Sequence, residues 1–238
     1  MEGPEGRSLD ALIGSTIQGL RERFRAVSID DFEFLAMRTW PATEEGRALG
    51  QRLLRVRCLG ERNLEGADPK ARTPGHVSLI ILPETGAGIA PWLSPDEALI
   101  RSLVDFFRDR VLITTRFHVT GPAYRSVPIA ATIHLRDDAR AAGEVAAAAR
   151  AAIARHFDPR YGGAGGRGWS FGRGVSVSEV YAILDAVRGV DFADGVTFAG
   201  ANAPSITLAA HELPRIGEED ITLTLMERRG REWAPVSL

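Results

Sequence analysis

The stretch of residues 161–190 constrains the fold of this chain more than any other part of the sequence. It begins as a glycine-rich loop that holds Trp169 and Phe171. Ser176 and Glu179 then have the spacing of a capping box, in which each side chain accepts a hydrogen bond from a backbone N–H left free at a helix start. The apolar residues that follow share one helical face: Val180, Ile183, Leu184 and Val187. The stretch therefore predicts a long loop that feeds a well-specified amphipathic helix.

Large aromatic side chains in such a loop have two common roles. Trp169 and Phe171 either pack into their own domain or are presented to a partner protein. The sequence favours neither role over the other, and both stay open at this point.

The length and charge of the chain limit the classes of function. With 238 residues it can form one large or two small domains. The formal net charge is only -2, so the total gives no support for binding to nucleic acid or to an anionic membrane. Cys58 is the single cysteine, which excludes an intrachain disulfide and a cysteine-rich zinc site.

The N-terminus gives no targeting signal. It lacks the basic start and apolar core of a secretory signal peptide, and no apolar run in the sequence approaches membrane-spanning length. We therefore expect a chain that folds in the cytoplasm without membrane insertion.

The first half of the chain predicts alternating helices and strands. A helical pattern over residues 9–20 is followed by a second capping box at Ser28 and Asp31. Strands are expected at residues 53–59, at residues 77–82 and through Phe117 and Val119. Between the last two, Ser94 and Pro95 have the form of an N-cap and a first helical position. This order is that of a small open-faced α/β sandwich.

The second half repeats this composition of elements. Residues 127–135 alternate like a long strand, and Pro128 within it argues for an edge position in the sheet. An alanine-rich helix, the glycine-rich loop and its helix follow, and short strands complete the chain. The predicted fold class is α+β, with two small open-faced α/β sandwich units followed by a short β-rich tail. The expected domains are residues 1–26 as an N-terminal helical segment, residues 27–122, and residues 123–238.

The sequence offers no recognisable catalytic or cofactor motif. Residues 163–168 satisfy the G-x-G-x-x-G pattern but follow a helix and precede a loop, which disfavours dinucleotide binding. The histidines occur singly on different elements and lack metal-ligand spacing. Cys58 alternates with apolar residues, as a core side chain does. We therefore expect no catalytic residue, no cofactor and no metal, and thus no enzyme.

Four segments, taken in order, resemble the C-terminal part of the baseplate J-like proteins, which are wedge components of contractile phage tails and related injection systems. They are the run from Arg25 into the helix after Ser28, the strand at residues 75–83 with the helix after Ser94, residues 168–181 with the Arg-Gly-Val-Asp that ends their helix, and residues 211–217. The order and spacing of these segments carry the resemblance. Family members usually have a long upstream region that this sequence lacks.

The resemblance implies a structural role. Such proteins are paired wedge subunits that form a ring around a central spike, so the implied partners are other wedge subunits and the spike or hub, in homo- and hetero-oligomers. The implied location is the cytoplasm during assembly and then the virion tail or injection particle. Interface candidates come from the first helix and from the loop with its helix: Leu12, Ile13, Phe24, Trp169, Phe171, Arg173 and Tyr181.

The alternative is a small enzyme or ligand-binding module whose site is assembled from residues distant in sequence. Such a module would have a concave pocket with perturbed titrating groups, whereas a scaffold would have flat, loop-rich contact surfaces. The sequence leaves open whether the particle is a phage, a tailocin or a secretion apparatus.

Overall fold

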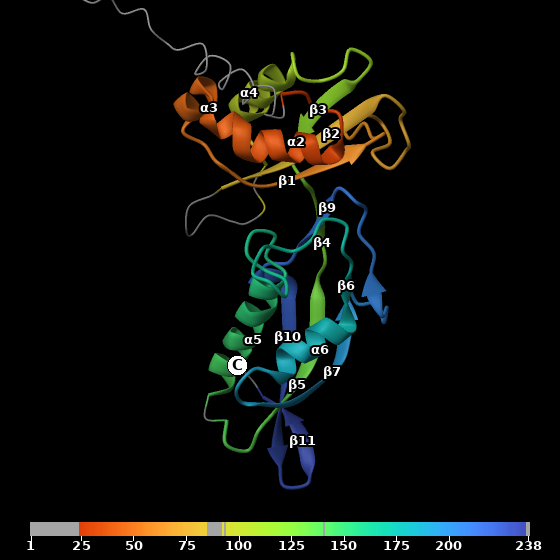
Figure 1. Cartoon of the computed structure of the whole chain (residues 1–238). Helices are drawn as coiled ribbons and strands as arrows, with labels where there is room; N and C mark the ends of the chain where they lie inside the picture. Colours follow the sequence, from red (N-terminus) through yellow and green to blue (C-terminus); the bar gives the residue numbers. More distant parts are fainter. Residues whose placement is uncertain (1–23, 85–91, 93, 140, 237–238) are drawn as a thin grey trace, which may run out of the picture. The chain divides into compact units, whose positions relative to one another are not determined.

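A computed structural model describes residues 24–84, 92, 94–139 and 141–236 of the chain. Contacts between residues divide it into two compact units. The first contains the described residues up to Leu79 together with Asp96–Thr120, and the second contains residues 121–236 with the described part of residues 80–95. In Figure 1 the first unit runs from red to green and the second from green to blue. The expectation that residues 27–122 and 123–238 are separate folding domains stays a prediction.

Short helices open the first unit. The capping box at Ser28 is confirmed, because Ser28 and Asp31 exchange hydrogen bonds at the start of α2 (Ile29–Phe34). The helix continues as a π-helical turn (Leu35–Thr39) and a 3-10 turn (Trp40–Ala42). The sequence pattern ends the helical region near Pro41, but a further helix, α3 (Glu44–Leu49), follows because Thr43 caps it by accepting the N–H of Gly46 at 3.1 Å.

A three-stranded sheet supports these helices, with the strand order β1 (Leu53–Gly60), β2 (His76–Pro83), β3 (Arg116–Thr120). Aromatic side chains from three elements meet on it: Phe32 of α2, Phe107 of α4 (Glu97–Phe107) and Phe117 of β3 have ring centroids 4.7–5.6 Å apart. Buried Trp40 donates its indole N–H to Ser102 Oγ at 3.0 Å, which joins the first helical region to α4. These contacts form the core of the first unit.

The predicted start of α4 is wrong by two residues. Asp96, not Ser94, is the N-cap, and its side chain accepts the N–H of Leu99 at 2.8 Å. Pro95 therefore lies before the helix. The helical spacing of the sequence predicts one buried face for α4, and the structure buries it: Leu99, Leu103, Phe106 and Phe107.

The second unit is built on a four-stranded mixed sheet with the order β11 (Glu232–Pro235), β10 (Ile221–Arg229), β5 (Ile129–Leu135), β7 (Val190–Phe198). Strands β5 and β10 are parallel, with Ile129 beside Ile221, whereas β7 and β11 run antiparallel to their neighbours. The expected β-rich tail is thus part of the main sheet of this unit. Strand β10 is one of the two inner strands of this sheet.

The edge position predicted for the strand around Pro128 is wrong. Pro128 lies in the gap between β4 (Ala123–Ser126) and β5. Its lack of an N–H therefore costs the four-stranded sheet no hydrogen bond. Strand β5 is free to pair on both sides, with β10 and with β7. The predicted strand therefore begins at Ile129 rather than at residue 127, and it is central.

Helices α5 (Ala142–His156) and α6 (Val177–Asp185) cover one face of this sheet (Figure 1). Alternate residues of β5 and β10 point toward them and are buried, including Ile133 and Leu225. Two short ribbons complete the unit: β4 with β9 (Glu212–Arg215), in parallel, and β6 (Val175–Ser176) with β8 (Ser205–Ile206), antiparallel. The α+β fold class is confirmed.

Candidate protein-binding surface around the glycine-rich loop

The loop between α5 and α6 is fastened at both ends to Asp158. The Oδ1 atom of Asp158 accepts the N–H groups of Arg160 at 2.6 Å and Tyr161 at 3.2 Å. Its backbone carbonyl accepts the N–H groups of Gly162 at 2.9 Å and Trp169 at 3.1 Å. Asp158 thus holds both the first residues of the loop and the returning backbone at Trp169. The glycines between them form a folded turn.

Glycine is required at the first turn of this loop. A Cβ atom on Gly162 would lie 2.4 Å from the carbonyl oxygen of His156, far inside van der Waals contact. Gly163 has a φ of +73°, a conformation that side chains with a Cβ rarely adopt. The glycine-rich composition therefore reflects close backbone packing rather than a phosphate-binding turn.

Trp169 is fully buried inside the second unit. Its ring packs edge-on against Phe157 at 4.8 Å and His156 at 5.6 Å between centroids. Its indole N–H donates to the carbonyl of Arg173 at 2.9 Å, and the Arg173 guanidinium lies 4.2 Å from the ring centroid. Of the two roles open to Trp169 from the sequence, the structure supports packing within its own unit.

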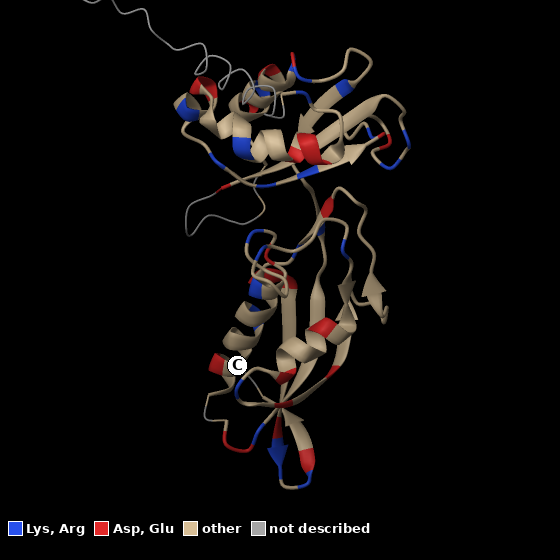
Figure 2. Cartoon of the chain, viewed as in Figure 1, with Lys and Arg blue, Asp and Glu red and all other residues tan. Residues whose placement is uncertain are grey.

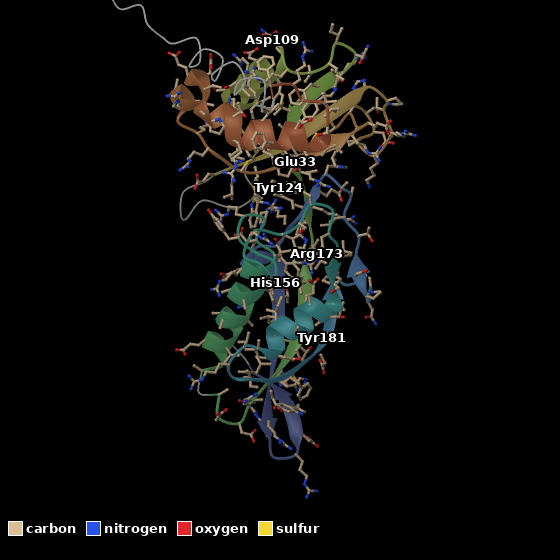
Figure 3. The ribbon with its side chains drawn as sticks, viewed as in Figure 1. Glu33, Asp109, Tyr124, His156, Arg173 and Tyr181 are labelled. Carbon is tan, nitrogen blue, oxygen red and sulfur yellow. The ribbon has the colours of Figure 1, made fainter. Side chains whose placement is uncertain are left out.

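The carboxylate of Glu179 joins the loop to both helices. The predicted capping box is confirmed, because the Glu179 N–H donates to Ser176 Oγ at 3.3 Å and the Ser176 N–H donates to Glu179 Oε2 at 3.4 Å. The other carboxylate oxygen accepts from Arg173 and lies 3.9 Å from Nε2 of His156 at the end of α5. Figure 3 labels His156 and Arg173, which come from α5 and the loop.

The remaining interface candidates fall into separate parts of the chain. Phe171 and Tyr181 are half-buried against the core of the second unit, and the Tyr181 hydroxyl accepts the N–H of Val196 at 3.3 Å. The side chain of Arg173 is 45% exposed. Phe24 belongs to the first unit, is exposed, and lies under the Arg110 guanidinium at 4.9 Å. Leu12 and Ile13 lie outside the described residues. An interface role for these residues stays a prediction.

The fold of this chain is similar to that of a chain in a solved baseplate. The solved structure is the cryo-EM structure of the anti-feeding prophage (AFP) baseplate, 6-fold symmetrised, with a TM-score of 0.51 and 12% sequence identity. The likeness covers 87% of this chain and 41% of the baseplate chain, so this chain spans about two fifths of its relative's length. No protein-family model and no curated protein matches the sequence.

The sheet that this baseplate-like fold contains has a second face, which sequence reasoning did not single out. Residues of β5, β10 and β7 that point away from α5 and α6 are mostly small or hydroxyl-bearing, with Asp194 beside Thr132: Ala130, Thr132, Thr197, Thr222 and Thr224. At one end His134 stacks on Phe192 at 4.0 Å and meets Trp233 edge-on at 4.6 Å. The alternation of threonine with apolar residues in residues 221–225 was the signal for this face.

The environment of Cys58 suppresses the reactivity of its thiol. Cys58 is fully buried, and burial together with the nearby Glu33 carboxylate raises the pKa of its thiol to about 12, so the nucleophilic thiolate does not form near neutral pH. Among the described residues no group of three or more His, Cys, Asp or Glu side chains is arranged to hold a metal ion.

Charged residues are spread over both units of the described chain. Figure 2 shows acidic and basic residues interspersed along each unit of the described chain. None of the helices described is long and apolar enough to cross a membrane.

Proposed function

We propose that this chain is a structural component of the baseplate of a contractile phage tail or related injection particle, and that it acts through protein–protein contacts. The observation that carries the proposal is the fold likeness to a chain of the AFP baseplate over 87% of this chain. The resemblance of four ordered sequence segments to the baseplate J-like proteins supports it from a separate direction.

The finer role we propose is that of a wedge subunit in a ring. The solved baseplate is 6-fold symmetrised, and a closed ring requires each subunit to present two complementary surfaces that repeat around the axis. The partners would be other wedge subunits and the central spike or hub. The chain would assemble in the cytoplasm and remain in the finished particle.

The surface we propose for one of these contacts lies over the glycine-rich loop and α6. Trp169 and the Asp158 turn hold the loop in one conformation, which lowers the entropy lost on binding. Arg173 is a half-exposed cation on that rigid support, and arginine is enriched where interfaces concentrate their binding energy. Phe171 and Tyr181 would contribute the apolar area around it.

Co-expression with the products of the flanking genes tests the proposal. The chain is captured by an affinity tag, the complex is weighed by native mass spectrometry, and its shape is examined by negative-stain electron microscopy. A wedge subunit is expected to bring a second baseplate protein with it in a fixed ratio. A folded chain that remains a monomer beside every neighbour would contradict the proposal.

Two variants separate the surface role of Arg173 from its internal contacts. Arg173→Ala removes the exposed cation and its bond to Glu179. Glu179→Gln weakens that same bond but leaves the cation in place and keeps an N3 residue suited to a capping box. We expect Arg173→Ala to reduce capture of the partner and Glu179→Gln to retain it. Equal loss in both variants would assign Arg173 to the internal structure of the loop.

A further inference from the structure

Three titratable side chains of the first unit form a hydrogen-bonded chain that the proposed function does not use. Nδ1 of His76, the first residue of β2, lies 2.9 Å from Nε2 of His118 in β3. Nδ1 of His118 lies 2.7 Å from Oε2 of Glu65, which belongs to the loop between β1 and β2. The two imidazole rings are nearly parallel, with an interplanar angle of 6°.

The geometry fixes where the protons are when both histidines are neutral. A carboxylate only accepts, so Nδ1 of His118 must carry a proton and donate it to Glu65. Nε2 of His118 then has a lone pair and can only accept, so Nδ1 of His76 must donate to it. Both rings are therefore protonated at Nδ1 in this state.

The hydrogen-bonded group of Glu65, His118 and His76 can keep its hydrogen bonds with one additional proton but not with two. With one more proton, His118 becomes an imidazolium that donates to Glu65 and, through Nε2, to a His76 ring whose proton has moved to its own Nε2. With a second proton, Nδ1 of His76 and Nε2 of His118 are both donors at 2.9 Å, so their hydrogen bond is lost and like charges face each other.

The surroundings add to the cost of the second proton. Desolvation by burial, His118 and the Arg116 guanidinium all lower the pKa of His76. Glu65 is the anion of the chain, but it bonds to the far nitrogen of His118. The charged groups facing His76 are therefore cationic or become so on acidification.

The other contacts of this loop have no group that titrates near neutral pH. Ser78 Oγ accepts the N–H of Leu64 at 3.2 Å and donates to the carbonyl of Arg62 at 2.9 Å. Glu61 forms a two-pronged pair with Arg72, at 2.6 and 2.9 Å, which lowers the pKa of that carboxyl. Of the described contacts of this loop, those through histidine involve the side chain type whose ordinary pKa lies nearest neutrality.

We propose that Glu65, His118 and His76 form a pH-sensitive latch that holds the loop of residues 61–75 against β2 and β3. At neutral pH Glu65 ties this loop to His118 of β3, and the bond between His76 and His118 ties the start of β2, where the loop ends, to β3. On acidification His76 becomes charged and separates from His118, which loosens the end of the loop that leads into β2, although the Arg116 N–H still donates to the Gly75 carbonyl at 2.8 Å. Loop order is retained above the pH at which His76 titrates and falls below it.

Nuclear magnetic resonance of the histidine ring nitrogens tests the latch on the full chain between pH 8 and 5. At pH 8 we expect both rings to be protonated at Nδ1, and below pH 6.5 we expect the His76 shifts to change together with faster hydrogen exchange of amides 61–75, after correction for intrinsic rates. Both rings protonated at Nε2 at pH 8 would overturn the proposal. A transition that disappears when EDTA removes metal ions would also overturn it, because the order of the loop would then depend on a bound metal ion and not on a proton.

Variants connect the transition to these residues. His76→Asn retains an N–H donor near the Nδ1 position without a titrating group, so loop exchange should lose its dependence on pH in this range. Glu65→Ala should release the loop at pH 8, by at least a severalfold rise in exchange. His134→Gln, in the second unit, is the matched control and should leave the loop transition unchanged. A pH response that persists in His76→Asn would overturn the latch.

Discussion

The indole N–H of Trp169 donates to the carbonyl of Arg173 at 2.9 Å, while the guanidinium of the same Arg173 lies 4.2 Å from the ring centroid. The loop therefore closes on itself around a buried aromatic ring. These two contacts tie the glycine-rich loop to the buried ring. A change at Trp169 should therefore also disturb the position of Arg173.

Replacing Trp169 by alanine should destabilise the chain strongly. The change removes a fully buried ring and leaves a cavity beside Phe157, a loss of about 3–5 kcal/mol for a core aromatic residue. Urea unfolding followed by far-UV circular dichroism measures it. Phe171→Ala, at a half-buried position of the same loop, is the comparison and should cost less. Equal losses would contradict the placement of Trp169 in the core.

Gly162→Ala should disrupt the turn after α5. The added Cβ would lie 2.4 Å from the His156 carbonyl oxygen and 2.6 Å from that of Asp158, so the backbone must move. We expect a clear fall in melting temperature by differential scanning calorimetry. Gly165→Ala is the matched control, because its Cβ would meet only the flexible side chain of Arg167 at 3.4 Å. A neutral Gly162→Ala would mean that the turn differs from the one described.

Ser176→Ala should weaken α6 by removing its cap. Loss of an N-cap hydroxyl typically costs about 1 kcal/mol, because an N–H at the helix start loses its acceptor. Ser178→Ala, at an exposed position inside the same helix, should be neutral within about 0.5 kcal/mol. Chemical denaturation compares the two. A larger loss in Ser178→Ala would contradict the capping role.

The thiol of Cys58 should be inert in the folded chain. Its pKa is raised to about 12, chiefly by burial, so iodoacetamide at pH 8 should label it only after unfolding. Mass spectrometry of the labelled protein with and without urea measures this. Rapid labelling of the native chain would contradict the burial of Cys58.

The same shift has a consequence for stability at alkaline pH. The pKa of the unfolded thiol is the ordinary 9.0, so above about pH 9 the unfolded chain loses a proton that the folded chain keeps until about pH 12. Stability should therefore fall as pH rises through this window. Cys58→Ala removes this contribution and should show a shallower fall in urea titrations from pH 8 to 10.

Features that depend on neighbours in sequence were predictable. The capping boxes at Ser28 and Ser176 join residues three apart, and the buried face of α4 follows from helical spacing. The start of α4 was predicted less well because Ser94 and Asp96 are both good N-caps. Tertiary contacts decided between them: Asp96 Oδ2 also accepts from the distant Gln51 side chain.

Features that depend on strand pairing were not predictable. Pro128 seemed to mark an edge strand, yet β5 became central because the proline falls in the gap before it. The histidines appeared single in the sequence, but β2 and β3 bring His76 within 2.9 Å of His118, 42 residues away. Spacing along the chain carries no information about which strands become neighbours.

The sequence by itself determined the α+β class, the two capped helices and the alternating strands, because these depend on hydrogen bonds and periodicity within a few residues. It left the role of Trp169 open between core and surface. Only the tertiary structure decided that the ring is buried, since its partners, His156 at the end of α5 and Phe157 just after it, come within reach only when the glycine turn at Asp158 folds back on the helix.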